Sequence, residues 1–287
     1  MHVIIIGSGP AGISAALYAR RGGADVTVIT KGTGGLAAAE WVENYYGFAE
    51  PISGAELEQR GIAGAKRLGV RFETDEVLAI LPADGGKGFC LETVRAAYDA
   101  DTVILAAGVP RKTLSIPGLR EFEGRGVSYC AICDAFFYRG KRVAVIGAGD
   151  YALHEAEILR PHAAQLSLLP NGEEPSVVVP DGISVRTQKI VRIDGVRRVQ
   201  RIVFDDDTAM DVDGIFMAIG TAGSMELARK LGVVLSDAKI VVGEHMETNV
   251  PGVYAAGDCT GGLLQIAKAV YEGAEAGLAA VRYLRKG

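Results

Sequence analysis

Short runs of consecutive apolar residues recur along the 287-residue chain, and two of them lead directly into a glycine-rich loop and a helical pattern. Val3–Ile6 precedes Gly7-Ser8-Gly9-Pro10-Ala11-Gly12, and Val143–Ile146 precedes Gly147-Ala148-Gly149-Asp150-Tyr151-Ala152. Apolar runs without polar alternation, separated by helical segments, are typical of the buried strands of parallel sheets. The pattern therefore predicts the unit strand–loop–helix twice in the same chain.

Each of these units continues in the same way. In the first, a strand at Val26–Thr30 and a hairpin-like stretch at Val77–Val94 lead to an apolar strand that ends at Gly108. In the second, a strand at Leu166–Leu169 and a hairpin-like stretch at Lys189–Met210 lead to a similar strand. The duplication predicts an α/β fold with two Rossmann-like, three-layer ββα nucleotide-binding domains.

The second domain is predicted to be inserted in the first. The segment Val253–Asp258 has the pattern of one more strand of the first sheet, so the C-terminal part of the chain returns to the first domain. We place the first domain at residues 1–113 and 238–287, and the inserted, central domain at residues 114–237.

Composition and charge exclude several classes of function. Hydrophobic residues make up 49% of the chain and charged residues 23%, as in an ordinary globular protein. The net charge is −5 and there is no basic stripe, so we expect no nucleic-acid partner. We expect no membrane partner, since no run of ~18 apolar residues is present. With no secretory signal visible, the cytoplasm is the expected location.

The first glycine loop has the spacing that binds a dinucleotide. Gly7 permits the tight turn, Gly9 lets the backbone approach a pyrophosphate, and Gly12 lets helix and strand pack closely. The following helix directs its free N–H groups at the phosphates. The pattern expects an acidic residue at the end of the next strand to hold the ribose, but that strand ends in Thr30-Lys31. The Thr30 hydroxyl could replace part of this contact.

Two cysteines form the chemically richest stretch of the sequence. Cys130 and Cys133 are three residues apart, so they can close a disulfide or present two thiols, and Asp134 beside them could deliver a proton. A structural zinc site needs about four ligands, and Cys90, Cys259 and the four histidines show no ligand spacing, so we predict no metal. A buried, inert pair is the other alternative. Cys90 and Cys259 are expected to be core residues.

A second ligand contact is predicted near the C-terminus. A strand that ends in Gly257-Asp258 places a carboxylate beside a ligand hydroxyl, and Gln265-Ile266-Ala267 opens a helix whose N–H groups can face an acceptor such as a flavin oxygen. The alternative is an Asp that caps a packing helix.

These segments together resemble the low-molecular-weight thioredoxin reductase family along nearly the whole chain. The resemblance rests on the first glycine loop, Val42–Phe48, Tyr129–Arg139, Gly147–Ala152 and Thr248–Asp258. It implies FAD on the first domain, a dithiol on the central domain, a homodimer, and a rotation that alternates the dithiol between flavin and thioredoxin. It also implies that Cys133 faces the flavin, that Cys130 attacks the disulfide of thioredoxin or a thioredoxin-like protein, and that Asp134 is the acid/base.

The FAD contacts expected from the motifs and the resemblance together lie in both parts of the first domain. They are Gly7, Ser8, Gly9, Pro10, Ala11, Gly12, Thr30, Gly34, Leu36, Asn44, Val77, Ala107, Gly108, Gly257, Asp258, Gln265, Ile266 and Ala267.

The chain departs from this family where NADPH would bind. Tyr151 replaces a serine of the second glycine loop, and Pro170–Glu174 replaces a segment with arginines that hold the 2′-phosphate. The carboxylates of Glu173 and Glu174 have the wrong sign for NADPH, although an acidic group can hold the ribose of NADH. The chain is similar to the ferredoxin-linked members, which implies ferredoxin as electron donor. An NAD(P)H-dependent reductase with an atypical nucleotide site and a flavoprotein redox sensor without turnover are the alternatives.

Overall fold

The computed structural model describes residues 1–83, 85–108, 114–220 and 223–286. The chain divides into two compact units, Met1–Val109 with Gly223–Gly287, and Pro110–Ala222. The predicted boundary between residues 113 and 114 lies outside the described residues. Residues 223–237, which the sequence analysis assigns to the central domain, belong to the first unit, because Lys230 Nζ donates to Leu78 O at 2.9 Å.

The first unit contains a five-stranded sheet in the order β18-β7-β1-β2-β3, in which every neighbouring pair is parallel. The central strand β1 contains four consecutive apolar residues, Val3–Ile6, that are at most 6% exposed, as expected for a strand that is buried on both faces. The strands are β1 (His2–Ile6), β2 (Asp25–Thr30), β3 (Arg71–Thr74), β7 (Thr102–Leu105) and β18 (Val253–Ala255). The short and partly exposed β3 has no apolar run, and the sequence did not predict it.

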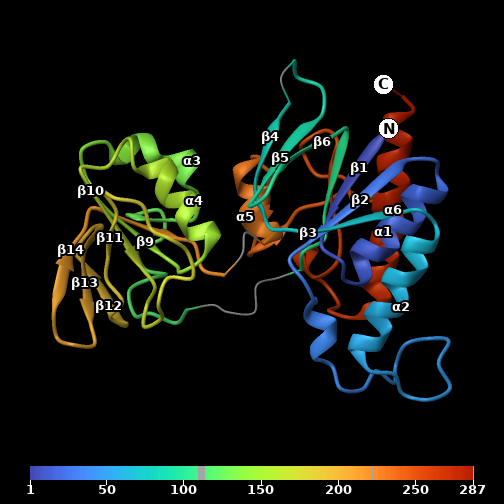
Figure 1. Cartoon of the computed structure of the whole chain (residues 1–287), viewed down its shortest axis with the longest axis horizontal. Helices are drawn as coiled ribbons and strands as arrows, with labels where there is room; N and C mark the ends of the chain where they lie inside the picture. The colour runs from blue at the N-terminus through green and yellow to red at the C-terminus, as the bar shows by residue number, and fades with distance from the viewer. Residues whose placement is uncertain (84, 109–113, 221–222, 287) are drawn as a thin grey trace. The chain divides into compact units, whose positions relative to one another are not determined.

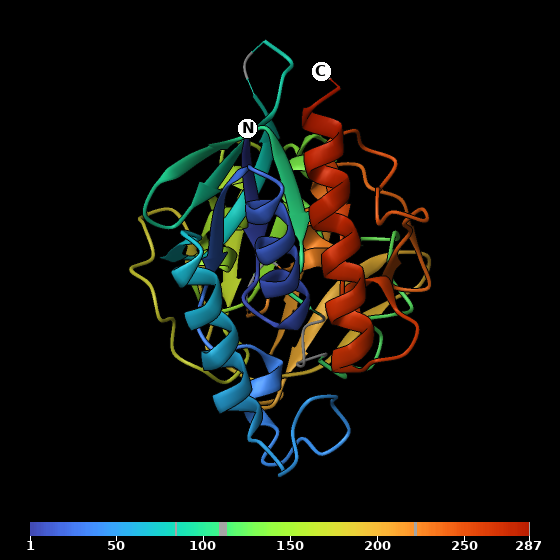
Figure 2. The same cartoon turned by 90° about the vertical axis from the view of Figure 1, so that its right-hand side faces the viewer.

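Helices cover one face of this sheet and an antiparallel sheet lies on its other side (Figures 1 and 2). The helices are α1 (Pro10–Arg21), α2 (Gly54–Arg67) and α6 (Ile266–Leu284), and the antiparallel strands are β4 (Val77–Pro82), β5 (Phe89–Thr93) and β6 (Ala97–Ala100). The remaining elements of the unit are η1 (Gly35–Ala38), α5 (Ser224–Lys230), β16 (Leu235–Ser236), β17 (Lys239–Ile240) and η3 (Asp258–Thr260).

The second unit repeats this plan. Its parallel sheet has the order β11-β10-β9-β15-β8, and β12, β13 and β14 form an antiparallel sheet beside it. The strands are β8 (Val127–Ser128), β9 (Arg142–Ile146), β10 (Gln165–Leu169), β11 (Ser184–Val185), β12 (Ile190–Gly195), β13 (Val199–Phe204), β14 (Ala209–Asp211) and β15 (Gly214–Met217). The helices are α3 (Ala131–Asp134), η2 (Ala135–Tyr138) and α4 (Asp150–Leu159).

The structure confirms the predicted fold class of two Rossmann-like α/β units, one of which interrupts the other. The two glycine loops connect β1 to α1 and β9 to α4, so each lies at the carboxyl edge of its parallel sheet. Within the described part of the chain, no helix combines the length and the apolar character needed to cross a membrane.

Close contact between α1 and α6 depends on glycine. A methyl group at Gly273 would lie 2.1 Å from the carbonyl oxygen of Ala11, far inside van der Waals contact, and that oxygen belongs to the backbone. By contrast, a methyl group at Gly64 of α2 would have no neighbour within 4 Å. The two glycines therefore separate the effect of packing from the helix propensity of alanine.

We expect Gly273→Ala to lower the free energy of unfolding by about 1–3 kcal/mol, since the overpacked helices must shift apart. Gly64→Ala should raise it by up to ~1 kcal/mol, because alanine favours a helix more than glycine does. Urea titration followed by circular dichroism measures both. Equal stabilisation by the two substitutions would contradict the close packing of α1 and α6.

Candidate functional site

The first glycine loop leaves space for a ligand at one position only. A methyl group at Gly7 would lie 2.4 Å from Ala106 O, and one at Gly12 would lie 1.9 Å from Gly7 O, so both glycines are needed for backbone packing. Gly9 differs, because a methyl group there would meet nothing within 4 Å. Gly9 is the N-cap of α1 and no side chain caps this helix. Free N–H groups beside open space are what a pyrophosphate requires.

A buried carboxylate lies beside this loop. Glu58 of α2 is 6% exposed, and the backbone N–H of Gly34 donates to its two oxygens at 3.0 and 3.3 Å. The hydroxyl of Ser8 donates to the same carboxylate at 3.3 Å and lies 3.0 Å from Thr30 Oγ1. Three predicted contact residues, Ser8, Thr30 and Gly34, are thus brought together around Glu58.

Glu58 was missed by the sequence analysis, which considered only the end of β2. One signal could have found it. Gly54, Glu58 and Ala65 are the buried residues of α2, so a carboxylate occupies the helix face that is otherwise small and apolar. A buried carboxylate is costly unless it has polar partners, so its presence on that face indicates a polar site.

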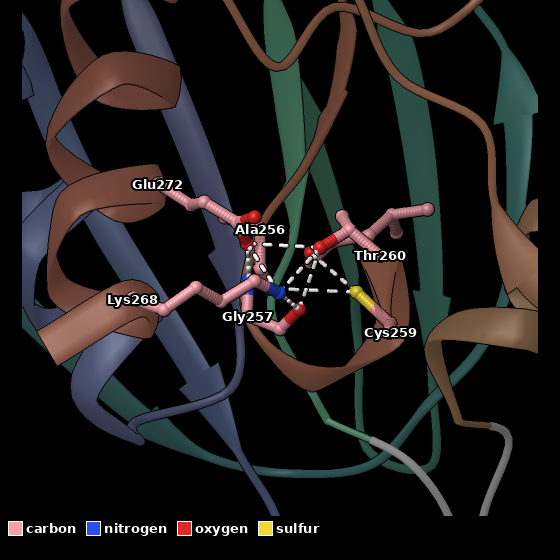
Figure 3. Close-up of polar contacts among 7 residues, drawn as sticks. Ala256, Gly257, Cys259, Thr260, Lys268 and Glu272 are labelled. Atoms are coloured by element: carbon pink, nitrogen blue, oxygen red, sulfur yellow. Dashed lines mark hydrogen bonds and ion pairs between the residues drawn. The ribbon is translucent and has the colours of Figure 1, made fainter. Parts of the chain in front are cut away.

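Residues of α6 hold the turn that contains Gly257 (Figure 3). This turn lies beside the first glycine loop, because a methyl group at Gly257 would lie 2.9 Å from Ala11 Cβ. Glu272 accepts from the N–H of Gly257 at 2.8 Å, while Lys268 Nζ donates to the carbonyl of Gly257 at 2.8 Å and lies 2.9 Å from Glu272. Thr260 joins the cluster by donating to Glu272 at 2.9 Å. Because the turn is fixed from both its N–H and its carbonyl, the exposed Asp258 is presented at a defined position.

Several predicted contacts are linked across long stretches of sequence. Asn44 Nδ2 donates to Gln265 Oε1 at 2.9 Å, so the 40–48 loop reaches the N-terminus of α6, which has no side-chain cap. The N–H of Ala107 donates to Ser224 Oγ at 3.0 Å. Leu36 and Val77 lie in the same unit as these residues. Lys268 and Glu272 were not predicted, although their i, i+4 spacing is the signal of a helical pair.

Cys259 is a buried thiol of the same turn. Its Sγ lies 3.4 Å from Ala256 O and 3.6 Å from Leu105 O (Figure 3). Burial raises the pKa of this thiol from 9.0 to about 11, so it stays protonated at physiological pH. Cys90 is half-buried. Because the thiolate is the reactive form, Cys259 has the character of a core residue.

The other two cysteines of the chain lie in the second unit and form a disulfide. Cys130 and Cys133 are bonded, with their Cα atoms 5.4 Å apart, immediately after β8 at the carboxyl edge of the sheet. Cys130 is 4% exposed and is the N-cap of α3, where its Sγ accepts from the N–H of Cys133 at 3.2 Å. Cys133 is exposed. A helix N-terminal N–H group that faces sulfur stabilises a thiolate there.

Carboxylates hold the disulfide segment on two sides. The hydroxyl of Ser128 donates to Asp134 at 2.7 Å and accepts from the N–H of Cys130 at 3.1 Å. Glu155 of α4, which is 1% exposed, accepts from the N–H of Ala131 at 2.8 Å. The Ser128 hydroxyl therefore bridges the Asp134 carboxylate and the backbone N–H of Cys130. Sequence reasoning found Asp134 and missed Glu155, because the contact of Glu155 spans 24 residues.

The second glycine loop is covered by the protein itself. Both the N–H and the hydroxyl of Ser176 donate to the carbonyl of Ala148, at 2.8 and 3.0 Å. A methyl group at Gly149 would lie 3.5 Å from Ser176 Oγ, whereas the equivalent point at Gly9 is open. Tyr151, which replaces the expected serine, is 1% exposed. A pyrophosphate that approaches Gly149 would therefore meet Ser176.

Among the described residues, no group of three or more histidine, cysteine, aspartate or glutamate side chains is placed to hold a metal ion.

Comparisons with known proteins point in one direction. Residues 1–273 match the model of the pyridine nucleotide-disulphide oxidoreductase family. The thioredoxin reductase of Listeria monocytogenes is 33% identical over 99% of this chain and 94% of its own length, and that of Bacillus subtilis is 32% identical over 99% and 95%.

Solved structures agree. The atypical thioredoxin reductase of Desulfovibrio vulgaris Hildenborough is 38% identical, with a TM-score of 0.94 over 99% of this chain and 98% of that one. A ferredoxin-flavin thioredoxin reductase of Clostridium acetobutylicum is 34% identical, with a TM-score of 0.75 over 100% and 98%.

We expect Cys259 to resist iodoacetamide in the native, oxidised protein at pH 8.5. With a pKa of about 11 instead of 9.0, its thiolate is ~100-fold scarcer, and only a pH near 11 would deprotonate it. Peptide mass spectrometry measures the labelling, with half-buried Cys90 as the internal comparison. Labelling in guanidinium should be fast. Equal rates for Cys259 in the native and unfolded chain would contradict its burial.

Proposed function

Because the chain belongs to the pyridine nucleotide-disulphide oxidoreductase family and is a flavoprotein of its thioredoxin reductase group, we propose that it reduces the disulfide of thioredoxin or a thioredoxin-like protein through the Cys130–Cys133 pair. The observation that carries this proposal is the disulfide itself, bonded at the start of a helix with an acidic side chain beside it. Cys133 is an exposed residue, and exposed disulfides are characteristically the labile or catalytic ones.

The cofactor of this group is FAD. The first unit fits it, because Gly9 is open where the pyrophosphate must approach and the N-terminus of α1 is uncapped. We propose that the glycine loop holds the pyrophosphate, that Asp258 receives a hydroxyl of the ribityl chain, and that the N-terminus of α6 faces the flavin ring. When bound, FAD supplies the electron pair that opens the Cys130–Cys133 disulfide.

In the thiol–disulfide exchange, residues of the second unit stabilise the attacking thiolate and transfer protons. A thiolate of the pair attacks the substrate disulfide, which forms a mixed disulfide and releases the first substrate thiolate. The second cysteine then attacks the enzyme sulfur of the mixed disulfide, which restores the Cys130–Cys133 bond and releases the second substrate thiolate. Each released thiolate takes up a proton, and the two enzyme thiols supply these protons. The N–H of Cys133, which faces Cys130 Sγ, stabilises a thiolate on Cys130. Asp134, hydrogen-bonded to Ser128, is the acid/base that we propose.

The two cysteines are assigned different roles. The resemblance assigns the attack on the substrate to Cys130 and the flavin side to Cys133. Their exposure favours the reverse order, because Cys133 is exposed and Cys130 is 4% exposed. We keep Cys130 as the attacking residue, since its sulfur is the one that accepts the N–H of Cys133.

We propose further that the electron donor is ferredoxin and that NADPH is a poor donor. Three observations support this. Ser176 covers the second glycine loop, the exposed carboxylates of Glu173 and Glu174 precede Ser176 in the sequence, and one similar structure is a ferredoxin-flavin thioredoxin reductase. An NAD(P)H-dependent reaction is the alternative, favoured by the likeness to ordinary thioredoxin reductases. A cytoplasmic homodimer completes the proposal, on the resemblance alone.

We expect Cys130→Ser and Cys133→Ser each to lower thioredoxin reduction by more than ~1,000-fold while the visible absorbance of FAD remains, since each removes half of the dithiol. Each variant is then mixed with a thioredoxin that has one activated cysteine. Cys133→Ser, which keeps Cys130, should form the stable mixed disulfide. Trapping by Cys130→Ser instead would reverse the two roles, and full activity of either variant would reject the dithiol.

We expect reduced ferredoxin to bleach the bound flavin under anaerobic conditions, and NADPH and NADH to do so at least ~100-fold more slowly at micromolar concentration, since a nucleotide must displace Ser176 and approach two carboxylates. Stopped-flow absorbance measures the rates. The variant Ser176→Ala tests the steric effect of Ser176 alone. The double variant Glu173→Gln/Glu174→Gln tests the effect of the two negative charges alone. Fast bleaching of the unaltered protein by NADPH would reject the ferredoxin proposal and leave the reductase proposal intact.

A further inference from the structure

We propose that Glu58 of α2 binds the hydroxyls of the adenosine ribose of FAD. Dinucleotide-binding loops ordinarily assign this task to an acidic residue at the end of the second strand. Here β2 ends in Thr30 and is followed by Lys31, so the task falls to a carboxylate that enters from another element. The inference rests on the proposal that FAD binds to the first unit.

The carboxylate of Glu58 lies at the end of β2, although it comes from a helix 28 positions further along the sequence than Thr30. Ser8, which precedes the open Gly9, donates to Glu58 at 3.3 Å, and its hydroxyl lies 3.0 Å from Thr30 Oγ1. A methyl group at Gly34 would lie 3.3 Å from Glu58 Oε1 and 3.9 Å from Gly9 Cα. The carboxylate is therefore next to the point where the pyrophosphate is expected.

The hydrogen bonding of Glu58 is incomplete for a buried charge. An ionised carboxylate offers about four acceptor positions for hydrogen bonds. Glu58 is only 6% exposed, so the protein must supply nearly all of its donors. Only the N–H of Gly34 and the hydroxyl of Ser8 donate to it in the described part of the chain. No lysine or arginine of the described residues pairs with it. The two hydroxyls of a ribose would supply the missing donors.

Asp75 and Glu76 are also buried carboxylates near the end of β2. Asp75 accepts from the N–H of Glu76 at 2.8 Å and from the hydroxyl of Thr93 at 2.7 Å. Glu76 differs from Glu58 in having a cation as partner. Lys31 forms an ion pair with Glu76, so a cation compensates this charge within the protein. Glu58 has neutral donors alone. An ionised group that is buried without a cation is costly, and further hydrogen bonds from a ligand reduce that cost. Of Glu58 and Glu76, Glu58 is therefore the carboxylate that gains more from ribose hydroxyls.

The test compares two flavins on the apoprotein. FAD and an analogue whose adenosine ribose lacks the 2′-hydroxyl are titrated separately, and the quenching of flavin fluorescence gives each dissociation constant. We expect the unaltered protein to bind FAD on the order of 10–100-fold more tightly than the analogue, as for a hydrogen bond to a charged group. In Glu58→Gln this ratio should fall below ~3-fold, because the charged acceptor is lost.

Glu56→Gln is the matched control. Glu56 lies on the same helix, is exposed, and contacts Arg60 at 2.6 Å, so the ratio should stay as in the unaltered protein. Circular dichroism of each apoprotein verifies the fold. If Glu58→Gln fails to fold, Glu58→Asp replaces it, because it keeps the charge but withdraws the carboxylate, and the same fall in the ratio is expected.

The outcomes distinguish a failure of this inference from a failure of the proposal that the first unit binds FAD. An unaltered protein that binds no FAD rejects the flavoprotein proposal itself. If the unaltered protein binds FAD but the ratio is near one, or if the Glu58 variants weaken both flavins equally and keep the ratio, Glu58 only supports the Gly34 loop. Either of those results overturns the role of Glu58 and leaves the reductase proposal standing.

Discussion

The structure depends on very close backbone contact at the carboxyl edges of its two parallel sheets. No side chain larger than hydrogen fits at Gly7 or Gly12, and a methyl group at Gly147 would lie 2.1 Å from Ala218 O. This contact fixes each glycine loop between the end of a strand and the start of a helix. Since helix N–H groups then point away from the sheet, both edges are built to bind a phosphate, and the neighbours of each loop decide whether one can enter.

The two edges differ in those neighbours. At Gly9 the space is open, and the side chains of Ser8, Thr30 and Glu58 converge beside it. At Gly149 the hydroxyl of Ser176 stands in the corresponding place, and two exposed carboxylates follow Gly172. The second unit instead holds the disulfide at its carboxyl edge, between Ser128 and Glu155. In the function that we propose, one fold thus supports a cofactor site in one copy and thiol chemistry in the other.

Local patterns made much of this predictable. Apolar runs and glycine spacing predicted the central strands of both parallel sheets, both loops and the insertion, but not the short strands β3, β8 and β11. The spacing of Cys130 and Cys133 indicated that they can form a disulfide, and they do. Contacts between distant segments were beyond such patterns: Glu58 meets Ser8 across 50 residues, and Glu155 meets Ala131 across 24. The charge of the segment after β10 predicted an unfavourable site for NADPH, but the cover by Ser176 depends on how that loop folds back, which no local pattern specifies.

The central claim is that electrons pass between a bound flavin and the Cys130–Cys133 disulfide. An anaerobic titration with dithionite, combined with a count of free thiols in the denatured product, tests it most directly. The account predicts uptake of about four electrons per flavin, two for the flavin and two for the disulfide, with about two new thiols per chain. Complete bleaching after about two electrons, with no new thiols, would contradict it.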